Sequence, residues 1–430
     1  MKKQSQHLIV ISLDALNALD FNYLKELPNI RAFIKKGSYV RELSSVYPTV
    51  TYTCHTSIIT GTYPDKHGIF SNEKVQPSKP SLQDWYWHKN AIKVPTLFDY
   101  AKNAGLKTAN VLWPVMASAK IDYNCPEIWS ENEGFISLFL KYGSIKALPL
   151  LLMEASNFKG KQQPYLDNFS EALAIRMIKS KKPNLLCLHL IELDHVRHHY
   201  GIMGEHSLEV LKRLDQRIGR IIEAVKDARI YDNTTFLILG DHGGSDFNTV
   251  VYLNKFFSEK NLIKLDIDNN IRSWKVYANS CGGSVHIHVN KSCSEKDRKT
   301  IHEIIYNLVN LEIPFVKKIY SKAEVQSLFK LSGSFEYVIE PNDGYIFRND
   351  IASNWILPSS MVENCLVSDH GQNPNHPGLK TLLFAKGNKI KPGVVIPKAS
   401  IVDAGPTMAE ILNLSMKNTD GRILSEILLS

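Results

Sequence analysis

Residues 8–14 read LIVISLD, an apolar run that ends at an acidic residue. Such a run is typical of a strand that is covered on both faces, as in a parallel sheet. Two later runs, 184–191 and 235–239, are also mainly apolar and are followed closely by Asp194 and Asp241. Because the carboxyl ends of parallel strands meet at one edge of a sheet, we expect Asp14, Asp194 and Asp241 to lie close together.

Helical patterns separate these strands, at 28–36, 51–61, 96–104, 167–179 and 207–228, and again at 406–412. The alternation predicts an α/β fold, a mostly parallel sheet sandwiched by helices. Strands at 364–367 and 381–384 would complete the sheet. From about residue 247 to residue 358 the pattern changes to shorter strands and helices, which we interpret as an inserted α+β cap. The predicted domains are a catalytic core of residues 1–258 and 361–430, and a cap of residues 259–360.

Residues 47–61 read YPTVTYTCHTSIITG and place Thr51 at the start of a short helix closed by Gly61. A helix N-terminus offers unpaired N–H groups and the positive end of a dipole, which suit an anionic group. Threonine is also a common helix cap, so the segment alone does not distinguish a binding role from a structural one. Residues elsewhere in the chain are needed to distinguish these two roles.

The composition is that of an ordinary soluble globular protein, with 44% hydrophobic and 22% charged residues. The net charge of +8 is scattered, with no long block of like charges, so a generic solvated surface explains it better than a specific binding site. A modestly basic surface would favour a small anionic ligand, and we expect no nucleic-acid polymer. The most apolar region, residues 135–153, is interrupted by Lys141, Lys146 and Pro149, which argues against a membrane span. With no signal-peptide pattern and no C-x-x-C pair among six cysteines, we expect free thiols and a cytoplasmic protein.

Several Asp and His residues form patterns typical of metal ligands. Asp194 and His198 are four residues apart, so one turn of backbone can direct both at one ion. Asp241 and His242 are adjacent, and the flanking glycines permit the sharp turn that would bring them together. With Asp14 and His370 the set has six ligands, more than one four-coordinate ion needs, and it suits two Zn²⁺ or Mn²⁺ ions.

Two ions about 4 Å apart can clamp the attacking and leaving oxygens of a phosphoryl displacement. Each motif has a structural alternative, because an Asp after a strand is often a helix cap and Asp-His-Gly is a common turn. It is improbable that all these motifs occur together in one α/β chain by chance. The motifs, in order, are ISLD (11–14), YPTVT (47–51), TGTYPDKHGIFSN (60–72), DHVRHHYG (194–201), GDHG (240–243) and DHG (369–371).

With these motifs the chain resembles the nucleotide pyrophosphatase/phosphodiesterase branch of the alkaline phosphatase superfamily. The resemblance implies two zinc ions, one held by Asp194, His198 and His370. The other would be held by Asp14, Thr51, Asp241 and His242. It further implies that Thr51 is the nucleophile, acidified by the metal and forming a phospho-threonine that water hydrolyses. Asn72 matches the asparagine whose amide donates to a phosphoryl oxygen, although a turn residue is the alternative.

The implied activity is hydrolysis of phosphodiester or pyrophosphate bonds, with nucleotides as the expected substrates. A phosphomonoesterase, a phosphonate C–P hydrolase or a non-catalytic metal-binding protein would use similar residues.

The chain departs from the family pattern after Thr51, where Thr53 and Cys54 replace Pro-Asn, and after His370, where His376 is a competing ligand. Trp85 belongs to an aromatic cluster that suits either a nucleobase or the core. His286 and His288 alternate on a cap strand, and we expect both to face solvent.

Overall fold

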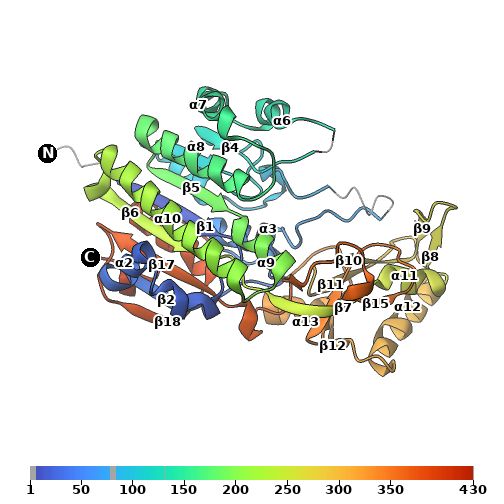
Figure 1. The fold of residues 1–430 in the computed structure, drawn as a ribbon. Coiled ribbons are helices and arrows are strands. Elements are labelled where there is room, and N and C mark those ends of the chain that lie inside the picture. Colours follow the sequence, from blue (N-terminus) through green and yellow to red (C-terminus); the bar gives the residue numbers. More distant parts are fainter. Residues whose placement is uncertain (1–5, 78–83, 131, 430) are drawn as a thin grey trace.

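The computed structural model describes residues 6–77, 84–130 and 132–429. In that part of the chain the main sheet has eight strands, in the order β18-β2-β17-β6-β1-β5-β3-β4 (Figure 1). They span His7–Leu13 (β1), Ser38–Ser44 (β2), Thr108–Val111 (β3), Tyr123–Cys125 (β4), Leu185–Leu190 (β5), Thr234–Leu239 (β6), Thr381–Gly387 (β17) and Val395–Ser400 (β18). All pairings are parallel except those of β17, which is antiparallel to β2 and β6. The predicted mostly parallel sheet is confirmed.

Helices cover both faces of this sheet, as predicted. Along β1, Ile9 and Ile11 pack into one apolar cluster while Leu8 and Val10 pack into the other, because successive side chains of a strand point to opposite faces. The first face is covered by α2 (Pro28–Lys36), α8 (Tyr165–Lys181) and α10 (Glu205–Asp227). The second is covered by α3 (Thr51–Thr60), α5 (Leu97–Asn103) and α14 (Ala404–Ile411).

A second sheet forms a smaller lobe at the far end of the molecule (Figure 1). It is antiparallel, in the order β10-β11-β13-β12, and spans Val276–Ser280 (β10), Val285–Val289 (β11), Val316–Ser321 (β12) and Tyr337–Pro341 (β13). The helices α12 (Glu295–Asn307) and α13 (Lys322–Phe329) join its strands. Helix α11 (Leu253–Glu259) packs into the same apolar cluster, so the packing of this lobe begins before residue 259. The predicted domain limits themselves stay a prediction.

A third, small sheet joins the two lobes. Its strand β7 (Ser245–Val251) pairs with β14 (Gly344–Phe347), β15 (Ile356–Pro358) and β16 (Ser368–Asp369). The predicted strand at 364–367 is wrong, because this segment is irregular and pairing with β7 begins only at Ser368. Cys365 and Leu366 instead pack against the apolar side chains of β7.

The prediction that His286 and His288 face solvent is also wrong. Their exposed fractions are 0% and 3%. Both lie on β11, a central strand, and the face that the alternation suggested would be exposed is covered by Phe335, which contacts both rings. A sequence pattern shows that a strand has two unlike faces, but not which segment later covers the polar one.

The remaining elements are short. They include α1 (Phe21–Leu24), α4 (Pro64–His67), α6 (Phe135–Tyr142), α7 (Leu148–Met153), α9 (Glu192–Tyr200), β8 (Ile263–Leu265) and β9 (Ile271–Trp274). The apolar region noted above is thus divided between α6 and α7, with Gly143 ending the first helix. Among the described helices, none has the length and apolar character that crossing a membrane requires.

Candidate functional site

The carboxyl ends of three parallel strands define the site. Asp14 directly follows β1, Asp241 follows β6 by one residue, and Asp194 lies in the first turn of α9, the helix that follows β5. The strands β6, β1 and β5 are neighbours in the sheet, so their ends deliver the three carboxylates to one place. Thr51 enters from the first position of α3, on the second face of the sheet.

The first group of side chains contains Asp14, Asp241, His242 and Thr51. The Nε2 atom of His242 lies 3.4 Å from Asp14 Oδ1 and 3.2 Å from Asp241 Oδ2. The Thr51 hydroxyl lies 3.4 Å from the same nitrogen. The two carboxylates and the imidazole are buried, and their ligand atoms fall within 4.8 Å of one another. The structure therefore brings together all four residues assigned to this ion by resemblance.

The second group contains Asp194, His198 and His370. The Oδ1 atom of Asp194 lies 3.3 Å from His198 Nε2 and 3.7 Å from His370 Nε2. The rings of His370 and His242 stack with their centroids 3.9 Å apart, so this group adjoins the first. His376, the competing residue, lies 3.6 Å from Asp343 and belongs to none of the ligand clusters in the described residues.

The histidines in both groups are oriented as metal ligands are. The Nδ1 atoms of His198, His242 and His370 contact the backbone carbonyls of Ser368, Gly243 and Thr49 at 2.8, 2.9 and 2.9 Å. A carbonyl only accepts, so each Nδ1 carries a proton, and Nε2 is the ring nitrogen left to bind a metal. A backbone carbonyl on the other ring nitrogen is the usual arrangement for a metal-bound histidine.

The carboxylates also fit bound cations. Asp14 Oδ1 and Asp241 Oδ2 are buried without a hydrogen-bond partner among the described residues. Burial, together with the negative charges of Asp241 and Asp194, raises the pKa of Asp14 well above its usual range. Burial opposes ionisation of Asp241 too, but His242 and His55 outweigh it and hold its pKa low. A divalent ion would relieve this crowding of negative charge, so the residues present suit one.

A similar balance holds in the second group. Burial would lower the pKa of His198, but the charge of Asp194 and its hydrogen bond outweigh burial and raise it to about 10. Burial and the charge of His242 lower the pKa of His370 to about 4. The His370 imidazole is therefore neutral at pH 7, the form that coordinates a metal.

Thr51 is the first residue of α3 and does not cap it. The capping position belongs to Val50, which offers no side-chain oxygen, and Gly61 ends the helix in the left-handed conformation, with φ of 66°. The structural alternative for Thr51, a simple helix cap, therefore does not describe this helix. Thr53 and Cys54, where the chain departs from the family pattern, are fully buried and do not line the cavity beside Thr51.

Asn72 faces the same cavity from the loop that follows α4. Its Oδ1 atom accepts a hydrogen bond from the backbone N–H of Tyr52 at 2.9 Å. The amide nitrogen, Nδ2, has no hydrogen-bond partner among the described residues and remains free to donate. The turn-residue alternative does not account for this contact with the first turn of α3.

Two buried histidines support the carboxylates and were not predicted as part of the site. His189 Nε2 lies 3.0 Å from Asp14 Oδ2, and His55 Nδ1 lies 3.3 Å from Asp241 Oδ2. His55 Nδ1 also contacts the Thr51 carbonyl at 2.8 Å, so it fixes the backbone at the start of α3. The signal for His189 was an imidazole inside the apolar run 184–191, one residue before its strand ends.

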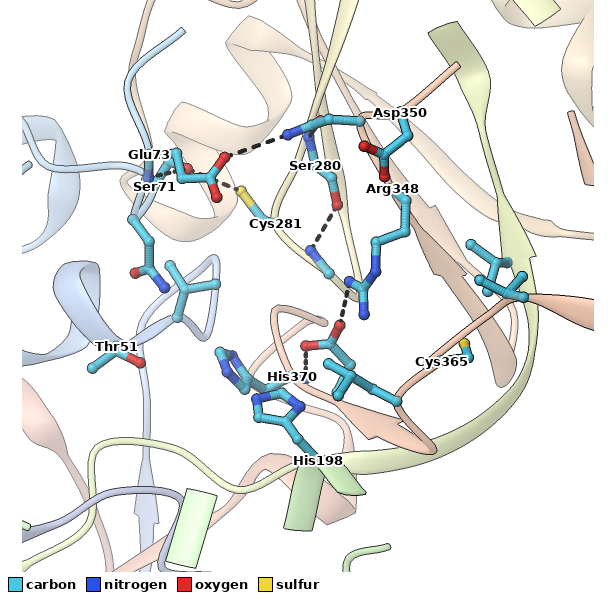
Figure 2. A pocket seen from close by; sticks show the side chains of 18 of the residues that line it. Thr51, Ser71, Glu73, His198, Ser280, Cys281, Arg348, Asp350, Cys365 and His370 are labelled. Carbon is cyan, nitrogen blue, oxygen red and sulfur yellow. Dashed lines mark hydrogen bonds and ion pairs between the residues drawn. The ribbon is translucent and has the colours of Figure 1, made fainter. Parts of the chain in front are cut away.

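A cavity of about 710 Å³ opens onto these residues. Thr51, Asn72, Asp194, His198 and His370 lie on its wall. Figure 2 shows Thr51, His198 and His370 facing side chains from the smaller lobe and from the segment after β14. Those opposing residues include Ser280, Cys281, Arg348 and Asp350. The site therefore lies between the main sheet and the smaller lobe. Trp85 also lines it, stacked on Trp87 with the ring planes 9° apart.

Comparisons with known proteins identify relatives of this chain. Human ectonucleotide pyrophosphatase/phosphodiesterase family member 1 is 26% identical over 274 residues, which are 60% of this chain and 26% of that protein. The chain thus spans about a quarter of the length of that relative. The bis(5′-adenosyl)-triphosphatase of Pongo abelii is 22% identical over 440 residues, 96% of this chain and 79% of that one.

Solved structures show the same fold. Murine ectonucleotide pyrophosphatase/phosphodiesterase 5 superposes with a TM-score of 0.70 at 18% identity, covering 99% of this chain and 100% of that one. An inactive variant of the murine protein in complex with AMP gives a TM-score of 0.69. The sequence profile of the type I phosphodiesterase/nucleotide pyrophosphatase family matches residues 8–373. The chain therefore belongs to the type I phosphodiesterase/nucleotide pyrophosphatase family.

Proposed function

We propose that the protein hydrolyses phosphodiester or pyrophosphate bonds of nucleotides through a phosphorylated Thr51. The observation that carries this proposal is the position of the Thr51 hydroxyl, 3.4 Å from Nε2 of His242, a ring that clusters with Asp14 and Asp241 and also with Asp194 and His370. A hydroxyl beside candidate metal ligands, on the wall of an open cavity, can attack a phosphorus atom held there.

Each residue of the site has a separate role in the proposed reaction. Asp194, His198 and His370, which meet around the Asp194 carboxylate, would hold one divalent ion. Asp14, Asp241 and His242 would hold the other, with zinc favoured by the mixed Asp and His ligands and manganese as the alternative. Bound ions would supply positive charge for the phosphoryl oxygens and would lower the pKa of the Thr51 hydroxyl. The Thr51 hydroxyl gives up its proton to solvent, and Oγ1 forms the new bond to phosphorus while the bond to the leaving group breaks on the opposite side. The oxygen of a water molecule then bonds to phosphorus, the bond from phosphorus to Oγ1 breaks, and Oγ1 takes up a proton again.

Two features of the chain place the phosphoryl group. Asn72 Nδ2 is free to donate to a phosphoryl oxygen, because Asn72 Oδ1 is engaged by the Tyr52 N–H. The N-terminus of α3, which begins at Thr51, adds the positive end of its dipole. Each group favours negative charge where it develops in the transition state.

The proposed nucleotide substrate rests on Trp85 and on the relatives. Trp85 lines the cavity beside Ser71, Asn72 and Glu73, and its ring plane is already part of a stack with Trp87. A half-buried indole of this kind offers a platform for a nucleobase. AMP is the ligand named for the murine relative, and a bis(5′-adenosyl) triphosphate is the substrate named for the Pongo abelii relative.

A substrate panel on metal-loaded enzyme tests the proposal. Bis(p-nitrophenyl) phosphate represents diesters, p-nitrophenyl phosphate monoesters and phosphonoacetate phosphonates. We expect the diester to have the highest kcat/KM. Faster turnover of the monoester or the phosphonate would replace the proposal with a phosphomonoesterase or a C–P hydrolase, and no turnover of any of the three would favour a metal-binding protein.

We also propose that the protein works in the cytoplasm. All six cysteines are unpaired in the structure, and four of them are buried. Free thiols are the usual state of cysteine in a reducing compartment. Cell fractionation with a tagged full chain tests this localisation, and recovery in the culture medium would contradict it.

A further inference from the structure

Arg348 lies on the cavity wall, directly after β14. Its Nη1 atom donates to Asp369 Oδ2 at 2.7 Å, and Asp369 Oδ1 accepts the backbone N–H of His370 at 2.8 Å (Figure 2). The guanidinium is therefore fixed one residue away from a candidate metal ligand. Its side chain is 28% exposed, so it borders the cavity and is not sealed in the core.

Part of this guanidinium is unused. An arginine offers five N–H donors from three nitrogens in a rigid planar group. In the described part of the chain, Arg348 donates through Nη1 to Asp369 and weakly to Phe347 O, and no bond is made by Nε or Nη2. Nε and Nη2 can therefore hold a second anion while Asp369 keeps the side chain in place.

The position of Arg348 matches the side from which a leaving group departs. Figure 2 shows Thr51 and Arg348 on opposite sides of the cavity, with His198 and His370 at its floor in this view. In an in-line displacement the attacking and leaving oxygens lie on opposite sides of phosphorus. If Thr51 attacks, the leaving group therefore lies on the Arg348 side.

The charges on the rest of the cavity wall disfavour an anion at any position other than Arg348. Among the described residues that line the cavity, Arg348 is the only lysine or arginine, while Glu73, Asp350 and Glu363 are acidic. A phosphate group that extended beyond the metal ligands would be repelled by those carboxylates and attracted only at Arg348. The electrostatics thus define one position for a second anionic group.

We propose that Arg348 binds the phosphate group on the far side of the scissile bond and so favours pyrophosphate substrates over simple diesters. The proposal rests on the function proposed above and names the residue that would set its substrate class. Arg348 is a specificity-determining residue in this account, because it touches the part of the substrate that leaves.

Two substrates that share one transferred group test it. Thymidine 5′-triphosphate and the p-nitrophenyl ester of thymidine 5′-monophosphate both transfer thymidine monophosphate, but only the first has a phosphate leaving group. Loss of a charge-assisted hydrogen-bond pair predicts that Arg348→Gln lowers kcat/KM for the triphosphate about 10- to 100-fold and for the ester by about threefold or less. Arg348→Lys, which keeps the charge without the planar group, should lie between.

The exposed Arg272 on β9 provides the matched control, Arg272→Gln, which should leave both substrates unchanged. Zinc content equal to that of the wild type shows that His370 is still in place. Equal losses on both substrates would mean that Arg348 acts only by holding Asp369 and His370 in place, and would overturn the proposal. An unchanged triphosphate activity would overturn it as well. Failure of the wild-type enzyme on both substrates would instead refute the proposed function itself.

Discussion

The side-chain oxygen of Asn72 accepts a hydrogen bond from the backbone N–H of Tyr52 at 2.9 Å. Tyr52 follows Thr51 in the first turn of α3, so the contact ties the position of the Asn72 amide to the residue proposed as nucleophile. The same contact assigns the two ends of the amide. Its oxygen is engaged by the helix, and its nitrogen is free to donate.

This arrangement predicts different effects for two substitutions of Asn72. Asn72→Ala removes a single donor to the phosphoryl group, for which about a 100-fold loss of kcat is expected. Asn72→Asp keeps the acceptor for the Tyr52 N–H but places a negative oxygen where the donor was, so its loss should be at least as large. Steady-state kinetics on the diester measure both. An aspartate variant that retained near wild-type kcat would show that the amide nitrogen does not contact the phosphoryl group.

Glu73 predicts a pH dependence of substrate binding. Burial raises the pKa of this carboxyl from 4.5 to about 7, with the charge of Asp350 adding to the shift and Arg348 opposing it. Below pH 7 the side chain is mostly neutral, and above pH 7 it becomes negative inside the cavity. The KM for an anionic substrate should therefore rise between pH 6 and 8. In Glu73→Gln that part of the rise should disappear, and an identical KM profile in both proteins would contradict the assignment.

The raised pKa of Glu73 has a matching effect on stability. Because the folded state holds this proton more tightly than the unfolded state, the group's contribution to stability falls as pH rises from 4.5 to about 7. Glu73→Gln should thus unfold with a weaker pH dependence than the wild type across that range. Urea unfolding at pH 5 and pH 8 measures the difference, and equal pH dependence in the two proteins would contradict it.

We predict that position 371, next to His370, does not tolerate a side chain. Its φ is 105°, and an added Cβ would lie 1.7 Å from the backbone oxygen of Cys281. Gly371→Ala should cost more than about 2 kcal/mol of stability and should also lower zinc content, because the adjacent His370 would move. Gly105 is the matched control, with φ of 72° and nothing within 4 Å of an added Cβ. Gly105→Ala should cost only about 1 kcal/mol and leave zinc content unchanged.

Removal of metal should affect activity and stability together. Asp14 and Asp241 would lose the cation that separates their charges, so chelated protein should be inactive and should have a lower Tm. Added zinc should restore both at two ions per chain. A Tm that did not change on chelation, with activity retained, would exclude the two groups as metal sites.

Much of the main sheet could be predicted, because its strands are buried on both faces and leave continuous apolar runs such as LIVISLD at residues 8–14. Asp14, Asp194 and Asp241 could be proposed as ligands for a related reason, since they follow those strands at one edge of the sheet. His286 and His288 could not be placed, because Phe335, far along the chain, covers them. Arg348 could not be found either, since it reaches the cavity only through the pairing of β14 with β7. Features that depend on the local sequence pattern could be predicted. Features that depend on packing against a distant segment could not.

The most direct test of the account is the activity of Thr51→Ala measured on protein of known zinc content. The Thr51 hydroxyl is the proposed attacking group, whereas Asp14, Asp241 and His242 remain to hold the ion beside it. We predict zinc content close to that of the wild type and a loss of kcat of about 1000-fold or more. Undiminished hydrolysis by Thr51→Ala with its zinc retained would contradict the central claim that Thr51 is the nucleophile.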